Sequence, residues 1–209
     1  FSTNVLPDLV RQYHEQYPQV NLSIQNIVMD DAIESVRKSR NELAISFASE
    51  NMNGLNFTPL YDVTFIAVYS DHFLPTLENV NLTEDWSPLF DLPMVAMDKD
   101  STVRRWLDET TQQHELQSQI VAEVNQLDSL GQLVSMGLGV GIVPSLCAEQ
   151  MQQMGLHMQK ISADILTRPV GVVTHNQSPL SSAGIGMVEL LKLDLARIQF
   201  QKHDKNSGE

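Results

Sequence analysis

The residue types that most often carry chemistry are sparse in this chain of 209 residues. Its one cysteine, Cys147, has no second cysteine to pair with inside the chain, and a single cysteine fits a reducing compartment. The six histidines include no pair at the i, i+4 spacing of a zinc-binding helix. They are His14, His72, His114, His157, His175 and His203. We therefore expect no disulfide framework, no metal site and no cofactor.

Three glycines, Gly137, Gly139 and Gly141, alternate with apolar residues between Met136 and Pro144. A dinucleotide-binding glycine loop follows a strand and opens a helix, so that the helix N-terminus faces the pyrophosphate. Here a predicted helix leads into the glycines and a predicted strand leads out. We interpret the motif as a helix C-cap followed by a tight turn, not as a nucleotide cradle.

Two further motifs are weak as sites. The sequence has no Gly-x-Ser-x-Gly elbow, and its Ser-x-x-Lys match at residues 35–38 falls inside a predicted helix with no supporting motif. The cluster Arg104-Arg105-Trp106 could offer a cation to an anionic ligand, or it could pair with Asp108 and Glu109 on the helix surface. We favour the surface pairing, and we expect no enzyme.

Hydroxyl groups stand where two predicted helices begin. Ser2 and Thr3 precede the first helix, and Ser101 and Thr102 precede the corresponding helix of the second half. Helix N-termini collect free N–H groups, so two such starts facing each other would suit a small anion, typically a carboxylate. Plain capping explains either pair alone, and the matching positions in the two halves favour a ligand site.

Hydrophobic periodicity predicts the elements that position these groups. It predicts a helix over residues 6–17, ended by Pro18, and a strand over residues 20–24. Asp30 and Ser145 are expected to cap later helices. Further strands are predicted at 43–47, 63–69, 94–97, 120–124, 140–143 and 169–174, and further helices at 102–114, 126–136, 145–154 and 181–197. This alternation predicts an α/β fold with mainly parallel sheets and two similar halves.

Composition excludes several classes of function. The 26 acidic residues outnumber 13 Lys and Arg, which gives a formal charge of -13. This balance argues against nucleic-acid binding by the chain itself, because phosphate binding needs a basic face. The apolar share of 42% and the charged share of 19% are typical of a globular domain. The chain has no apolar run of transmembrane length, and its first residues do not form a signal peptide. We expect a cytoplasmic protein without membrane contact.

Five motifs, in order along the chain, resemble the effector-binding domain of LysR-type transcriptional regulators. The most specific runs from Leu133 to Pro144. The others are Leu6-Pro7 with Tyr17-Pro18-x-Val20-x-Leu22, Asn41-Glu-Leu-Ala-Ile45, Pro59-Leu60 with Val63 to Val68 and Asp71-His72, and Leu82-Thr-Glu-Asp85. The family usually has Asp where this chain has Glu42, and it often has His-Pro-Leu where this chain has His72-Phe73-Leu74.

The resemblance implies a two-subdomain fold like that of type II periplasmic binding proteins, with crossover strands near residues 69–70 and 173–174 and a ligand cleft between the subdomains. Subdomain I would take residues 1–70 and 170–209, and subdomain II residues 71–169. A small, anionic effector would be the ligand. The contacts that the resemblance implies are Ser2, Thr3, Met29, Ser46, Phe47, Ser101, Thr102, Asn125, Val143 and Thr174.

The resemblance also implies residues upstream of Phe1, namely the family's first strand and a winged helix-turn-helix that would bind DNA. We therefore expect the sensing domain of a bacterial transcription factor, working as a homodimer or tetramer. In that assembly, helix 6–17 would pack near helix 126–136 of a second copy. The main alternative is an extracytoplasmic solute-binding protein of a transporter, which shares the fold and would have a signal peptide upstream instead.

Overall fold

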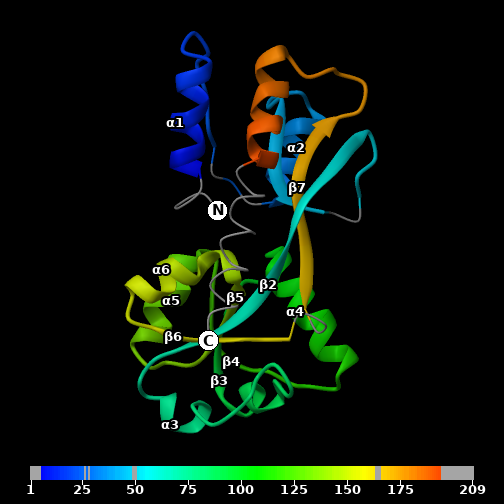
Figure 1. The fold of residues 1–209 in the computed structure, drawn as a ribbon. Helices are drawn as coiled ribbons and strands as arrows, with labels where there is room; N and C mark the ends of the chain where they lie inside the picture. Colours follow the sequence, from blue (N-terminus) through cyan, green and yellow to red (C-terminus); the bar gives the residue numbers. More distant parts are fainter. Residues whose placement is uncertain (1–5, 26, 28, 49–50, 163–165, 194–209) are drawn as a thin grey trace. The chain divides into compact units, whose positions relative to one another are not determined.

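The computed structural model describes residues 6–25, 27, 29–48, 51–162 and 166–193. The chain divides into two compact units, Phe1–Asp62 with Pro169–Glu209, and Val63–Arg168. Strands β2 (Leu55–Tyr69) and β7 (Thr167–His175) each run across the limit between the units. Within the described residues they are neighbours in a sheet of order β1-β7-β2-β5, and β6 also pairs with β2 (Figure 1).

In the first unit, helix α1 (Leu6–Gln16) and the helical residues 182–193 pack on one apolar cluster, which Tyr13 and Leu191 help to fill. The Tyr13 hydroxyl donates a 2.7 Å hydrogen bond to the Ala183 carbonyl and so fastens the two helices together.

Helix α2 (Met29–Arg37) covers one face of strand β1 (Leu43–Phe47) in the same unit. Its buried Ile33 joins a second apolar cluster, to which Ala44 of β1 also belongs. β1 pairs antiparallel with β7 and ends beside the start of α2, because only a short turn connects the helix back to the strand.

The second unit is built around β3 (Pro93–Met97) and β4 (Gln119–Val124), which are parallel and connected by α4 (Thr102–Gln113). Two apolar clusters form its core, one around Phe65 and Leu89 and the other around Val95 and Leu130. The remaining elements are α3 (Leu74–Leu77), the 3-10 helices Ser87–Asp91 and Ser145–Cys147, α5 (Leu127–Ser135), β5 (Gly141–Pro144), α6 (Ala148–Gln153) and β6 (His157–Lys160). None of the helices described is long and apolar enough to cross a membrane.

A mixed α/β architecture is thus confirmed, but the prediction of mainly parallel sheets is wrong. The ladders of β1 with β7, and of β5 and β6 with β2, are antiparallel, whereas β3 and β4 form a parallel ladder. Strand–helix alternation predicts parallel pairing only when consecutive strands are neighbours. The strands that cross between the units pair instead with strands of opposite direction, and the alternation does not reveal this.

The predicted strand over residues 20–24 is also wrong, because these residues belong to no strand or ladder in the described part of the chain. Its side chains do alternate: Val20 and Leu22 pack against the apolar cluster of the first unit, while Ile24 is 53% exposed. Alternation reports which side chains face a core, whereas a strand also needs a neighbour for its backbone hydrogen bonds.

Both predicted caps are wrong. Asp30 lies within the first turn of α2, where a carboxylate suits the positive end of the helix, rather than before it. Ser145 opens a 3-10 turn, and its hydroxyl accepts a 3.3 Å bond from Thr64.

Candidate functional site

The candidate residues of the first unit gather only in part. Met29 opens α2, and Ser46 and Phe47 end β1, so these three lie at one end of the helix–strand pair. Thr174 stands opposite Leu43, at the other end of the β1–β7 ladder. Ser2 and Thr3 lie outside the described residues.

The Ser46 hydroxyl is the most unusual group at this end of β1. Ser46 is 7% exposed, and its oxygen is shielded from solvent without a hydrogen-bond partner among the described residues. Buried hydroxyls on helices are satisfied: Ser35 donates to the Ala32 carbonyl at 2.7 Å and Thr110 to the Trp106 carbonyl at 2.8 Å. Leaving a buried polar group unpaired costs about 1–3 kcal/mol. A hydrogen-bond partner from outside the described chain would therefore stabilise the Ser46 hydroxyl.

Two other buried hydroxyls, those of Tyr61 on β2 and Ser70 directly after it, are also without a partner in the described part of the chain. Neither residue is predicted as a site from the sequence. A tyrosine or serine on a strand is unremarkable as a sequence feature, and only the crossover expected near residues 69–70 pointed to this strand.

The start of α4 carries the candidate groups of the second unit. Ser101 occupies the N-cap position, but its side chain makes no capping bond. Its backbone N–H donates instead to the Asp98 carboxylate at 2.9 Å. The Thr102 hydroxyl accepts a 3.0 Å bond from the Arg105 guanidinium. A helix N-terminus with an arginine beside it favours an anion.

Asn125 and Val143 differ in what they can offer a ligand. Asn125 directly follows β4 and is exposed, so its amide is accessible. Val143 is fully buried on β5 and packs in the cluster around Val95 and Leu130. Its side chain therefore contributes to the core.

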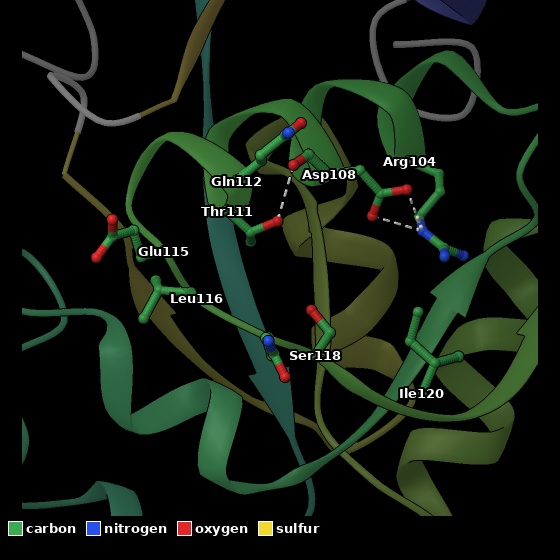
Figure 2. Close-up of a pocket in the computed structure, with 9 residues that line it drawn as sticks. Arg104, Asp108, Thr111, Gln112, Glu115, Leu116, Ser118 and Ile120 are labelled. Carbon is green, nitrogen blue, oxygen red and sulfur yellow. Dashed lines mark hydrogen bonds and ion pairs between the residues drawn. The ribbon is translucent and has the colours of Figure 1, made fainter.

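The predicted pairing of Arg104 with Asp108 is confirmed, but its predicted surface position is wrong, because Arg104 is only 6% exposed. Its Nε lies 2.8 Å from Asp108, as the predicted helical spacing requires (Figure 2). Its Nη1 lies 2.7 Å from Glu123 and 3.0 Å from the Met97 carbonyl. The hydrogen bond from Arg104 lowers the pKa of the Glu123 carboxyl. Two carboxylates thus neutralise this cation. Arg104 ties α4 to the ends of β3 and β4 and is not left for an anionic ligand.

An open depression of about 480 Å³ lies between the end of α4 and the start of β4 (Figure 2). Its lining is mixed, with the acidic Asp108 and Glu115, the apolar Leu116 and Ile120, and Arg104. It adjoins the start of β4, whereas Asn125 follows the opposite end of that strand. The depression is therefore separate from the candidate residues of this unit.

The described residues show little that could carry catalysis. They include no group of three or more His, Cys, Asp or Glu side chains placed to hold a metal ion. Burial raises the pKa of the Cys147 thiol to about 11, which keeps it protonated and unreactive at neutral pH. The Ser35 hydroxyl is engaged with the Ala32 carbonyl, and Lys38 lies 3.1 Å from Glu34.

The glycine motif has the predicted structural role. Gly137 has a φ of 79° and its N–H donates to the Val134 carbonyl at 2.9 Å, so it caps α5. At Gly139 a Cβ would lie 2.4 Å from the Pro93 carbonyl oxygen, which shows how closely the turn approaches β3. The C-cap interpretation is confirmed.

Comparison with known proteins shows the family. The model of the LysR substrate binding domain matches residues 1–195. A "Probable RuBisCO transcriptional regulator" of Guillardia theta is 26% identical over 182 residues, which cover 83% of this chain and 57% of that protein. A protein of the same description from Synechocystis sp. is 23% identical, with coverage of 99% and 64%. The chain thus spans about three fifths of these relatives.

Solved structures show the same fold. The effector-binding domain of QuiR in complex with shikimate matches with a TM-score of 0.80 and 17% identity over 93% of this chain and 92% of that one. The Synechocystis PCC6803 CcmR regulatory domain in complex with 2-PG matches with a TM-score of 0.76 and 18% identity over 90% and 89%. The two-subdomain fold of type II periplasmic binding proteins is confirmed. With the family model covering nearly the whole sequence, this chain belongs to the LysR substrate-binding domain family, the effector-binding domains of LysR-type transcriptional regulators.

Proposed function

We propose that this domain senses a small anionic metabolite, held by candidate residues of both subdomains, and thereby controls transcription. The observation that carries the proposal is the buried Ser46 hydroxyl, which has no hydrogen-bond partner in the described chain. In a family of effector-binding domains, a bound effector is the natural candidate for that partner. A ligand oxygen would supply the missing hydrogen bond. The subdomain limits expected from the resemblance, 1–70 with 170–209 and 71–169, are part of this proposal.

The start of α4 supports an anion as the ligand. The helix N-terminus and the Thr102 hydroxyl together offer positive charge of the helix dipole and hydrogen-bond donors. Shikimate, the ligand in the QuiR structure, carries a carboxylate. Asn125 would add an amide from the end of β4, and Met29 and Phe47 would supply apolar contact.

The response would be a shift between two arrangements of the protein. A ligand moves such an equilibrium only by its difference in affinity for the two states. We propose a homodimer or tetramer in which α1 of one copy packs near α5 of another, in the cytoplasm. Because this chain carries a charge of -13, DNA would be bound by other residues of the whole regulator. Catalysis is not part of this function, and the naming of relatives as transcriptional regulators disfavours a transporter's solute-binding protein.

Thermal unfolding with candidate ligands tests the proposal. Shikimate, 2-PG and a panel of small carboxylates are titrated, and we expect at least one to raise Tm in a concentration-dependent manner. Ser46→Ala and Thr102→Val should each weaken that ligand at least fivefold without unfolding the domain. Ser23→Ala, which removes an exposed hydroxyl from the same unit as Ser46, is the matched control. Equal affinity in wild type and both site variants would refute the proposed site.

A further inference from the structure

Tyr61 occupies a special place on strand β2. It lies one residue before Asp62, where the strand leaves the first unit, and the second unit begins at Val63. Its hydroxyl is shielded from solvent and has no hydrogen-bond partner within the described residues. Burial raises the pKa of this phenol, so the hydroxyl remains a donor throughout the physiological pH range.

The Tyr61 side chain is not explained by core packing. The four tyrosines of the chain all lie in the described part, and the other three, Tyr13, Tyr17 and Tyr69, belong to apolar clusters. Tyr61 belongs to none of the four clusters found among the described residues. Its neighbour Leu60 does pack against the apolar cluster of Tyr13 and Leu191, so the strand itself is anchored without Tyr61.

Folding alone would favour phenylalanine at this position. Phenylalanine keeps the ring and removes the buried oxygen that lacks a partner, and a polar group left unpaired in the folded state is destabilising. Tyr13 shows the opposite case, because its hydroxyl donates to the Ala183 carbonyl at 2.7 Å. Unsatisfied polar groups in native structures are few and commonly mark functional positions.

We propose that the Tyr61 hydroxyl is a further effector contact, which donates a hydrogen bond from the crossover strand to an oxygen of the bound anion. This proposal rests on the proposed sensing function and adds a residue to its site. A contact on the strand that runs from one unit into the other would let a ligand distinguish between arrangements of the protein, as a population shift requires.

The test compares Tyr61→Phe with the matched variant Tyr13→Phe in the 209-residue chain. Without ligand, Tyr61→Phe should raise Tm by roughly 2–4 °C, whereas Tyr13→Phe should lower it, because only Tyr13 loses a hydrogen bond that stabilises the fold. A fall in Tm for Tyr61→Phe would overturn the proposal, since its hydroxyl would then have a partner in the free protein, such as a buried water.

The second arm uses shikimate, 2-PG and inorganic phosphate as probes. For any probe that raises the Tm of the wild type, Tyr61→Phe should weaken binding by about tenfold, measured by calorimetry, and Tyr13→Phe should leave it unchanged. Unchanged affinity in Tyr61→Phe would overturn the proposal. If none of the three binds the wild type, the carboxylates of the wider panel take their place in this arm, while the ligand-free comparison by itself overturns the Tyr61 proposal if Tyr61→Phe lowers Tm.

Discussion

Replacing Glu115 by glycine should stabilise this protein, because Glu115 holds a backbone conformation that favours glycine. Within the described residues, four helices end in the same motif, with one residue in the left-handed region. Gly137 and Gly155 hold that place after α5 and α6, with φ of 79° and 76°, but Ser39 holds it after α2 and Glu115 after α4, with φ of 53° and 57°. The motif after α4 is complete, since the N–H groups of Glu115 and Leu116 donate to the carbonyls of Gln112 and Thr111 at 3.2 and 2.9 Å.

The magnitude follows from two opposing terms. A side chain in the left-handed region costs about 1–2 kcal/mol relative to glycine. Glycine has more freedom in the unfolded chain, which offsets roughly 0.4–1 kcal/mol of that gain. Because Glu115 is exposed, it has little packing to lose. Glu115→Gly should therefore raise the free energy of unfolding by about 0.5–1 kcal/mol, and Tm by about 1–4 °C.

Urea unfolding followed by circular dichroism measures this difference as a shift in midpoint at constant slope. Ser39→Gly should give a similar gain, and the two should add because the sites share no partners. Gly155→Ala is the reverse control, since a Cβ there would meet nothing within 4 Å and only the conformational term remains. A neutral or destabilising Glu115→Gly, alongside a Gly155→Ala that lowers stability, would refute this prediction.

Three further predictions concern packing, reactivity and pH. Gly139→Ala should destabilise the protein by about 1–3 kcal/mol in urea unfolding, because its Cβ would lie 2.4 Å from the Pro93 carbonyl oxygen; wild-type stability would contradict that close approach. Burial raises the pKa of the Cys147 thiol to about 11, so Cys147 should react with iodoacetamide at pH 8 at least tenfold more slowly than free cysteine. Mass spectrometry measures the two rates, and equal rates would show that the thiol is accessible. The hydrogen bond from Arg104 lowers the pKa of Glu123 below its ordinary 4.5, so its stabilising effect should be present above pH 4.5 and be lost as pH falls through the lowered value. The stability difference between wild type and Glu123→Gln should accordingly shrink on acidification, and a constant difference would argue against this ion pair.

The local structure of this chain could be predicted well from its sequence, because helix ends and apolar periodicity are encoded by neighbouring residues. β1 was predicted at residues 43–47 and is observed over Leu43–Phe47, and Gly137 was predicted as the C-cap that it is. The direction of strand pairing was not predictable in the same way. It depends on which distant strands β2 and β7 meet, and no short pattern records that.

The burial of individual polar side chains was equally out of reach. Arg104 stands three residues into a helix with Asp108 one turn later, which is the usual pattern of an exposed ion pair. What buries it is Glu123, a residue of β4 that only the fold brings within 2.7 Å. A charge pattern on one helix therefore cannot show whether a cation is free for a ligand.

Whether a buried hydroxyl has a hydrogen-bond partner helps to identify a ligand site, and only the structure shows this. Ser35 and Ser46 are the same residue type and are similarly buried. Ser35 donates to a carbonyl of its own helix, whereas the Ser46 hydroxyl, on strand β1, has no partner in the described part of the chain. A helix offers a nearby carbonyl to every serine on it, but a strand does not. An unpartnered hydroxyl on a strand is thus the stronger indication of an external ligand, and this is why Ser46 and Tyr61, rather than the hydroxyls at the helix starts, are the decisive residues to mutate.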